Sequence, residues 1–501
     1  MNWQPSDERR DFAGVSSRRT EYAGDLRAAF YATASATANE ASSPGSAERA
    51  AGSETVAARG TPRRLLLLAS KLGYQTRSFA LAARKVGAEV VIGSDRCHQL
   101  DDPWADGAIP LHFEQAEQAA ATLVEALRAK PVHAILALGD RQTVTAAYAA
   151  RALGLRYNSP EAVENCRSKL RQREVLQAAG LPVPDFFWFS LREEVAAILP
   201  RVIFPSVLKP LRLAASQGVI RADNAAEFRA ASERIAQLLA SPEVQVTREG
   251  ELDRLLVERY IPGAEVALEG LLEAGKLRVL ALFDKADPLT GPYFEESIYV
   301  TPSRLAPELQ SRIATCAAQT ARALGLTEGP IHAEFRVNEN GPWVLEMAPR
   351  PIGGLCSRAL RFGPERIFLE ELLVRHALGL PGADLAREES AAGVMMIPVP
   401  GSGTLEDVEG VERALGTRGI TEIEITARRH DFIAAWPEGA SYLGFIFARG
   451  DTPEGVEAAL REAHDQLCFT IAPRLQVAHP AWPEAPLRSF NLNADKGDLS
   501  A

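Results

Sequence analysis

The sequence predicts a multidomain protein that combines an α/β region with α+β regions. Three observations indicate this class: the length of 501 residues, alternating strand and helix patterns in residues 61–160, and paired strand patterns joined by short turns beyond them. A chain of this length exceeds one ordinary core, so two to four domains are expected. The hydrophobic content of 46% and charged content of 24% are typical of a soluble globular protein.

Residues 61–160 are predicted to form an N-terminal parallel α/β domain. The buried-strand pattern RRLLLLAS precedes an amphipathic helix pattern, TRSFALAARKVG, and the strands AEVVIGS and HAILALG and the helix TAAYAARALGL continue the alternation. Such an alternation is typical of a small doubly wound sheet. No glycine fingerprint follows the first strand, so dinucleotide binding is not predicted.

Residues 161–385 have a different, α+β pattern. The strands RVIFPSVLKP and RLLVERYI are predicted, with one hairpin about Ala274-Gly275 and a second hairpin in IHAEFRVNENGPWVLEM. A long helix is expected over Pro307–Leu324, because proline is tolerated in the first helical turn. The pattern RIFLEELLVRHALGLPG predicts a helix that ends at glycine and proline.

The remaining segments are a predicted third unit and two polar ends. Residues 386–480 contain the strand patterns GVMMIPVP, GITEIEIT and YLGFIFARG and one helix, which predict a small open α+β sheet. Residues 1–60 have few large apolar groups and are expected to be disordered, with a wrongly chosen start codon as the alternative. Residues 481–501 are expected to form a polar tail.

Charge and cysteine content narrow the function classes. The net charge of −10 argues against a nucleic-acid partner, although local lysines can still bind an anionic ligand. Five scattered cysteines without metal-type spacing indicate reduced thiols in a cytoplasm. We expect no membrane association, because no apolar run reaches membrane length and the N-terminus lacks a signal-peptide pattern.

The second hairpin predicts a metal site. A three-residue loop at residues 339–341, with Gly341 left-handed, would pair Asn338 with Pro342 and therefore Glu334 with Glu346. Like charges directly opposite each other destabilise a sheet. A divalent cation between the two carboxylates would remove the repulsion, and oxygen ligands suit Mg²⁺ that also binds phosphates.

Arg350, Gly353 and Gly354 follow the same strand and predict an anion site. The planar guanidinium suits phosphate or carboxylate oxygens, and glycine lets backbone N–H groups approach an anion. An Arg–Glu surface pair followed by a turn is the alternative.

Other nucleotide-binding candidates are individually ambiguous. Lys209 ends an apolar strand, where its side chain reaches either solvent or an anion, and the small residues around Ser216 and Gly218 are candidates for a flap over phosphates. Glu258 and Glu265 flank a Pro-Gly bend and are candidates for the adenine amino group and the ribose hydroxyls, with solvated acids as the alternative.

Taken in order, these residues resemble the ATP-grasp superfamily across roughly residues 62–385. The ordered set consists of Lys169, the AGLPVP stretch, Lys209, Glu258, Glu265, Glu334, Glu346 and Arg350. The stretch from Glu346 onward, EMAPRPIGGLCSRAL, and the C-terminal unit are similar to the L-amino-acid ligase group. The resemblance implies an ATP-grasp fold with an N-terminal parallel α/β domain and a small C-terminal α+β unit.

The resemblance also implies a function and roles for single residues. It implies an ADP-forming carboxylate–amine ligase that uses ATP and Mg²⁺, with Mn²⁺ as a substitute, and that joins a small-molecule carboxylate and an amine through an acyl phosphate; a homodimer is expected. Lys169 and Lys209 would hold phosphates, and Glu334 and Glu346 would bind two Mg²⁺ ions. The remaining implied contacts are adenine with Glu258 and the backbone of Arg259, Tyr260 and Ile261, ribose with Glu265, and the transferred phosphoryl group with Arg350.

Substrate selection is expected in the segment DKADPLTGPYFEESIYVTPS. Glu295 and Glu296 are candidates for an α-amino group, Tyr299 for a pocket wall, and Lys285 for the γ-phosphate; Asp140 is a weaker substrate candidate. Ala348 departs from the family, which often has asparagine two residues after the second metal-binding glutamate. Two alternatives therefore stay open: another ATP-grasp ligase, of phosphoribosylamine–glycine or biotin-carboxylase type, and a nucleotide-binding regulatory protein without turnover.

Overall fold

The computed structural model describes residues 62–70, 73–95, 108–381 and 384–473. The predictions for residues 1–60 and 481–501, and Cys97, lie outside these ranges. Within them, no helix is both long and apolar enough to cross a membrane.

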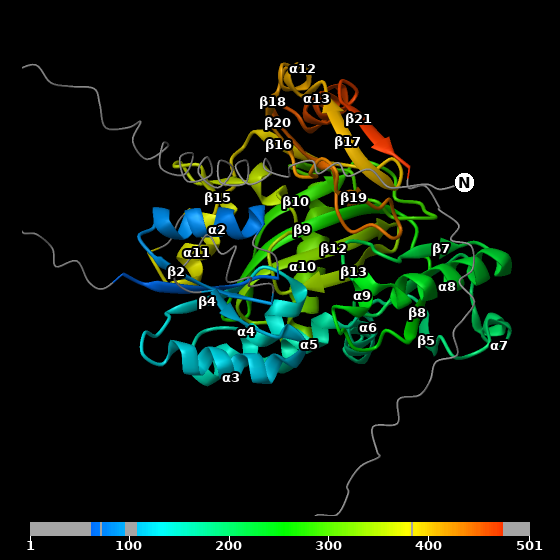
Figure 1. Ribbon diagram of the computed structural model, residues 1–501, viewed down its shortest axis with the longest axis horizontal. Coiled ribbons are helices and arrows are strands. Elements are labelled where there is room, and N and C mark those ends of the chain that lie inside the picture. The colour runs from blue at the N-terminus through cyan, green and yellow to red at the C-terminus, as the bar shows by residue number, and fades with distance from the viewer. Residues whose placement is uncertain (1–61, 71–72, 96–107, 382–383, 474–501) are drawn as a thin grey trace, which may run out of the picture. The chain divides into compact units, whose positions relative to one another are not determined.

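The first sheet is parallel, as the strand–helix alternation predicts. Its strand order is β3-β2-β1-β4, and every neighbouring pair is parallel. The strands are β1 (Arg64–Leu68), β2 (Glu89–Ser94), β3 (Ala108–Pro110) and β4 (Ala134–Ala137), and the helices are α2 (Tyr74–Lys85), α3 (Ala116–Leu127) and α4 (Asp140–Leu153). Alternate leucines of β1 enter different cores: Leu65 and Leu67 pack with α2, whereas Leu66 and Leu68 pack with α3 and α4. Helix α2 lies on one side of this sheet, and α3 and α4 lie on the other (Figure 1).

A second sheet of four antiparallel strands follows, in the order β5-β8-β6-β7. Its strands are β5 (Phe186–Ser190), β6 (Ser206–Pro210), β7 (Ile220–Ala222) and β8 (Arg254–Arg259), and the nearby helices are α5 (Pro160–Arg167), α6 (Lys169–Ala178), α7 (Val195–Ile198), α8 (Ala225–Ala240) and α9 (Pro242–Gln245). The Asn224 side chain caps α8 by accepting hydrogen bonds from two backbone N–H groups of the first turn, which fixes where that helix begins.

The largest sheet has eight strands in the order β13-β12-β9-β10-β11-β16-β20-β18, all paired antiparallel. They are β9 (Ala264–Glu273), β10 (Lys276–Lys285), β11 (Ile298–Thr301), β12 (Gly329–Asn338), β13 (Gly341–Ala348), β16 (Ala391–Ile397), β18 (Ile420–Ile425) and β20 (Gly444–Gly450). The hairpin predicted about Ala274-Gly275 is confirmed, with both residues at positive φ. The predicted helix α10 (Pro307–Leu324) is also confirmed and packs against β12 and β13.

The strands after residue 386 do not form a small sheet of their own. β16, β20 and β18 extend the eight-stranded sheet, and only three strands form a separate sheet: β17 (Gly403–Glu409), β19 (Phe432–Ile433) and β21 (Cys468–Ala472). The helices of this region are α12 (Val411–Leu415) and α13 (Pro453–His464), preceded in the chain by α11 (Leu369–Ala377) and the short pair β14 (Arg361–Phe362) and β15 (Ile367–Phe368). The predicted domain boundaries therefore remain a prediction.

The β12–β13 hairpin has the predicted pairing but not the predicted turn. Asn338 pairs with Gly341, so the loop has two residues rather than three, and Gly341 has φ +111°. The register then shifts by one residue at a β-bulge at Leu345, which restores Glu334 opposite Glu346. The Leu345 carbonyl accepts a hydrogen bond of 2.8 Å from Arg173 of α6, so a tertiary contact stabilises the bulge.

Candidate active site

One large cavity collects most of the predicted site residues. Its volume is about 1060 Å³, and it is lined by residues of the second and third sheets, of the segments that follow β1 and β4, and of the region around β19 and β20. The predicted residues on its wall are Lys169, Lys209, Ser216, Glu258, Arg259, Tyr260, Ile261, Glu265, Glu296, Tyr299, Glu334, Glu346, Arg350, Gly353 and Gly354.

Glu334 and Glu346 face each other across β12 and β13, as the sequence predicts. Both line the cavity, with side chains 23% and 30% exposed, so each carboxylate is accessible to a ligand. Lys169 lies 3.4 Å from Glu346, and Lys285 lies 3.4 Å from Glu334. These lysines offset part of the repulsion between the two carboxylates.

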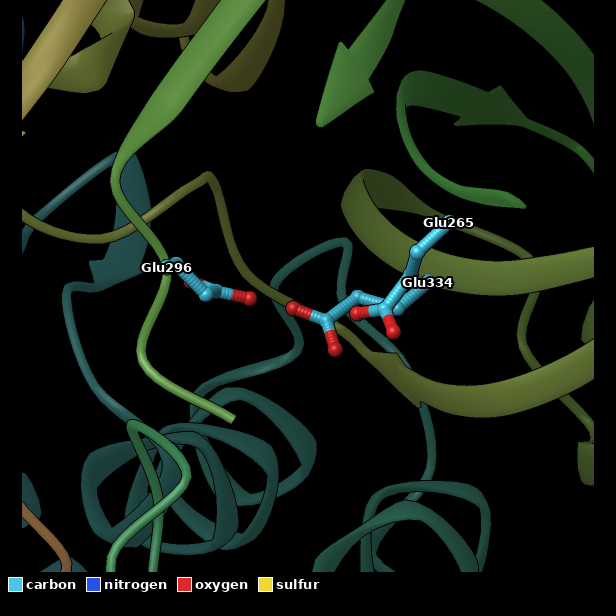
Figure 2. Close-up of side chains that lie close together, drawn as sticks. All are labelled: Glu265, Glu296 and Glu334. Atoms are coloured by element: carbon cyan, nitrogen blue, oxygen red, sulfur yellow. The ribbon is translucent and has the colours of Figure 1, made fainter. Parts of the chain in front are cut away.

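Glu334 also belongs to a cluster of three carboxylates. Glu265 of β9 and Glu296 of the loop before β11 offer oxygens that lie within 4.8 Å of one another and of a Glu334 oxygen. Figure 2 shows Glu296 approaching from the side opposite Glu265 and Glu334, with the three carboxylates pointing toward one another. The predictions from the sequence assigned these acids to three separate ligands, and they did not include that the three carboxylates lie close together.

Lys285 lies within this carboxylate cluster and is buried. Its Nζ donates to Glu265 at 2.5 Å and also to Glu296. Burial alone would lower the pKa of Lys285, but the surrounding carboxylates raise it well above its usual value. Lys285 does not line the cavity, so the structure places it as the internal counter-ion of the acids rather than at the position of a γ-phosphate.

The neighbouring acids Glu296 and Glu334 have opposite pKa shifts. Burial raises the pKa of Glu296 to about 7, and the Lys285 charge only partly offsets it. Burial also acts on Glu334, but Lys285 and His332 outweigh it and lower the pKa of that carboxyl. Glu334 is therefore ionised at neutral pH, where Glu296 is only partly ionised.

His332, a strand residue not named among the candidate site residues above, also borders the cavity. Its Nδ1 lies 2.5 Å from Glu269, and its Nε2 lies 3.4 Å from Glu334. Burial would lower the pKa of His332, yet the two glutamates raise it to about 9. The period of two in a strand places His332 on the same face as Glu334, and this signal was available in the sequence.

Glu258 forms buried ion pairs with two cationic side chains. Arg173 Nε donates to it at 2.7 Å and Lys209 Nζ at 2.6 Å. Burial would raise the pKa of Glu258, but the two cations lower it to about 2, whereas burial lowers the pKa of Lys209 despite its carboxylate partner. Arg173 was missed, although its spacing of four residues from Lys169 places both on one face of α6.

The predicted adenine-binding segment lies on the cavity wall and is contacted by two arginines. The guanidinium groups of Arg221 and Arg336 lie over the Tyr260 ring, 4.2 and 4.9 Å from its centroid. Arg336 also donates to the Tyr260 hydroxyl at 2.6 Å and to the Ile261 carbonyl at 3.1 Å, and it pairs with Glu265. Arg336 was not among the candidates predicted from the sequence.

The segment Ala214–Gly218 lies at the cavity and is hydrogen-bonded to the C-terminal region. Ala215 and Ser216 both have positive φ. Trp436 Nε1 donates to the Ala215 carbonyl at 3.2 Å, and the Gly218 N–H donates to the Pro437 carbonyl at 3.0 Å. Ser216 lines the cavity, but Gly218 does not, so the expected backbone contact of Gly218 with a phosphate is not supported.

Arg350 lies at the cavity and is paired with the N-terminal sheet region. Its Nε and Nη2 donate to the two carboxylate oxygens of Asp140 at 2.7 and 3.1 Å. Burial would raise the pKa of Asp140, but Arg350 lowers it; burial would lower the pKa of Arg350, but Asp140 raises it. Asp140, a weaker substrate candidate in the sequence, lines the cavity and is the partner of the predicted catalytic arginine.

Two of the predicted substrate acids have different positions. Glu296 lines the cavity, whereas Glu295 does not and instead accepts a 3.4 Å hydrogen bond from the Val399 N–H. Both lie in a loop without strand periodicity, so the sequence could not tell which one faces inward. Tyr299, Gly353 and Gly354 line the cavity as predicted.

The donor set fits a divalent cation bound together with a phosphorylated ligand. Glu334 and Glu346 supply hard oxygen ligands on adjacent strands, which suit Mg²⁺ and leave positions for phosphate and water. Lys169 contacts Glu346, and Lys209 is on the same cavity wall, so cations for phosphate oxygens are present beside the acids.

Comparisons with known protein families agree with this geometry. Residues 202–359 match the model of the ATP-grasp domain, and residues 80–155 match the ATP-grasp N-terminal domain. The chain belongs to the ATP-grasp superfamily. Within it, residues 395–472 match the L-amino acid ligase C-terminal domain 2, so the chain is L-amino-acid ligase-like.

A solved structure supports the same placement. The crystal structure of L-amino acid ligase from Bacillus licheniformis is 26% identical, covers 82% of this chain and 99% of its own, and superposes with a TM-score of 0.70. The mixed fold of parallel and antiparallel sheets predicted from the sequence is confirmed by this match.

Two curated relatives are similar over part of their length. Alanine–anticapsin ligase of Bacillus amyloliquefaciens is 27% identical over 48% of this chain and 53% of its own. An uncharacterized protein, y4rH, of Sinorhizobium fredii is 26% identical over 63% of each chain. The chain thus spans between about half and two thirds of the length of these relatives.

Proposed function

We propose that the protein is an ADP-forming carboxylate–amine ligase that activates the carboxyl group of an amino acid with ATP. One observation carries this proposal: Glu334 and Glu346 lie opposite each other in the same cavity wall as Lys169 and Lys209. Acids that can bind Mg²⁺ beside cations that can bind phosphates are what phosphoryl transfer requires.

In the first step the substrate carboxylate attacks the γ-phosphorus of ATP, forming an acyl phosphate and releasing ADP. Lys169 and Lys209 hold phosphate oxygens, and Tyr260 and Ile261 line the adenine site. Glu334 and Glu346 would hold Mg²⁺, which would neutralise charge on the phosphate oxygens. Arg350 stabilises the negative charge that develops on the transferred group.

In the second step an amine attacks the acyl carbon. The C–N bond forms, the C–O bond to phosphate breaks, and inorganic phosphate leaves with one oxygen of the original carboxylate; the amine proton passes to solvent. Neither step needs an enzyme nucleophile, and Cys356, which borders the cavity, is buried, which raises the pKa of its thiol and keeps it protonated.

Amino-acid substrates are favoured by the wall beyond the metal-binding acids. Glu296 can accept an ammonium group, and Tyr299 and Tyr442 border the same part of the cavity. The names of the relatives, alanine–anticapsin ligase and L-amino acid ligase, agree with this choice. The C-terminal match to an L-amino acid ligase domain favours it over the two other ATP-grasp ligase types.

We further propose a cytoplasmic homodimer. The described cysteines Cys166, Cys316, Cys356 and Cys468 are all free thiols, which suits a reducing compartment. Sedimentation at several concentrations tests the dimer, and a single monomeric species would contradict it.

The test combines turnover with isotope transfer. The protein is incubated with Mg²⁺-ATP and pairs of amino acids, and ADP and amide products are measured by mass spectrometry. The proposal predicts ADP release that depends on an amino acid, and transfer of one ¹⁸O atom from a labelled carboxylate into inorganic phosphate. ATP binding without amino-acid-dependent ADP would favour the regulatory protein instead.

A further inference from the structure

Arg350 has a fixed partner that the proposed chemistry does not itself require. Asp140 is the first residue of α4 and lies 210 positions before Arg350 in the chain. Its carboxylate accepts from Nε and Nη2, the two N–H groups on one edge of the guanidinium, and the Pro351 carbonyl accepts from Nη1 at 3.0 Å. A planar fork held along one edge by a carboxylate has a fixed plane.

The geometry leaves part of the guanidinium available to a ligand. A guanidinium carries five N–H groups, and three of them are used by Asp140 and Pro351. Arg350 borders the cavity, and Glu346 is among the acids whose charge acts on it. The remaining N–H groups therefore belong to a rigid, cavity-facing cation beside the proposed metal site.

We propose that Asp140 is a positioning residue that fixes the orientation of Arg350, so that the unshared N–H groups meet the reacting carboxyl and phosphoryl oxygens. The inference rests on the proposed function, since Arg350 acts only if phosphoryl transfer occurs here. An arginine whose side-chain orientation is already fixed loses little further orientational entropy when the transition state forms. Such positioning accelerates the reaction.

A simpler role for Asp140 is to join two regions of the fold or to stabilise the start of α4. A carboxylate at a helix N-terminus is favourable without any role in chemistry. The pair Arg156–Glu328 joins the same two regions, at 3.4 Å, and neither residue lines the large cavity. Glu328→Gln is therefore a matched control for loss of an ion pair between these regions.

The experiment compares Asp140→Asn with Glu328→Gln and with Arg350→Lys. In Asp140→Asn we expect kcat to fall about 10- to 100-fold, the range for a lost hydrogen bond to a charged group, with KM for ATP changed by no more than about twofold. Glu328→Gln should lower Tm by about as much as Asp140→Asn lowers it, and it should leave kcat unchanged. Asp140→Glu, which keeps the charge, should recover part of the rate.

A double-mutant cycle tests whether Asp140 acts through Arg350. In the Arg350→Lys background, Asp140→Asn should lower kcat by less than about threefold, because the group it orients is already gone. Full additivity of the two losses would overturn the proposal. So would a loss of kcat in Glu328→Gln equal to that in Asp140→Asn.

A second readout does not depend on turnover. Phenylglyoxal modification of Arg350, followed by peptide mass spectrometry, should be slow in the wild type and faster in Asp140→Asn, because the pair shields the guanidinium. Equal rates would overturn the positioning role. If wild type turns over no amino-acid pair but the labelling difference is found, the proposed function fails and the fixed orientation of Arg350 stands.

Discussion

Replacing Glu258 with glutamine should destabilise the fold by a magnitude that the structure defines. Glu258 is 2% exposed and is paired with Arg173 and Lys209, which lower its pKa from 4.5 to about 2. A shift of that size corresponds to about 3 kcal/mol, since each pKa unit is about 1.4 kcal/mol. The burial that lowers the pKa of Lys209 offsets part of this, so about 3 kcal/mol is the upper end.

The loss should depend on pH in one direction. The folded-state pKa of Glu258 is depressed, so its contribution is fully present above the unfolded value of 4.5 and is lost as pH falls toward about 2. The difference in unfolding free energy between wild type and Glu258→Gln should therefore be constant from pH 7 to 5. It should have narrowed by roughly 1 kcal/mol at pH 3.5.

Urea denaturation at a series of pH values measures this difference. Glu273→Gln, at an exposed position at the end of β9, is the matched control and should change the unfolding free energy by less than about 0.5 kcal/mol. A loss below about 1 kcal/mol in Glu258→Gln would refute the reasoning. A loss that stays the same size down to pH 3.5 would also refute it, because the ionised carboxylate would then not be its source.

Three further variants test separate parts of the site. Glu346→Gln should lower turnover at least about 100-fold through weaker Mg²⁺ binding. The control Glu339→Gln, at the exposed turn of the same hairpin, should leave turnover unchanged. Full activity of Glu346→Gln in steady-state assays would refute the metal assignment. Trp436→Phe removes the hydrogen bond to the Ala215 carbonyl and should raise KM for ATP roughly fivefold, the equivalent of about 1 kcal/mol. An unchanged KM for ATP in kinetic titrations would contradict this prediction. Gly263→Ala would place a Cβ 2.1 Å from a backbone oxygen of β12 at φ +126°, so we expect a loss of at least about 3 kcal/mol in thermal or urea unfolding, and a wild-type Tm would contradict this.

The local sequence patterns predicted strands and helices, but they did not predict the turn and the bulge that set the register of the β12–β13 hairpin. The pairing of Glu334 with Glu346 is correct, but it was reached through a three-residue turn that does not exist. A shorter turn and the bulge at Leu345 compensate each other, and the Leu345 carbonyl accepts a hydrogen bond from Arg173, which lies 172 positions earlier in the chain. Only tertiary structure could show that contact.

The site residues show the same division between local and non-local information. The predicted hairpin pairing placed Glu334 opposite Glu346, and the period of two, applied from Glu334, would have added His332. It could not show that Lys285 is buried among carboxylates, or that Glu296 rather than Glu295 faces inward, because those depend on how β9, β12 and the loop before β11 come together. Long-range ion pairs such as Asp140–Arg350 leave no periodic pattern at all.

A crystal structure with Mn²⁺ and a non-hydrolysable ATP analogue tests the central claim most directly. The anomalous signal of Mn²⁺ should lie between the carboxylates of Glu334 and Glu346, with the triphosphate also contacting Lys169 and Lys209. A manganese peak between Glu265 and Glu296 without Glu346, or a triphosphate bound away from both lysines, would contradict the proposed ligase site.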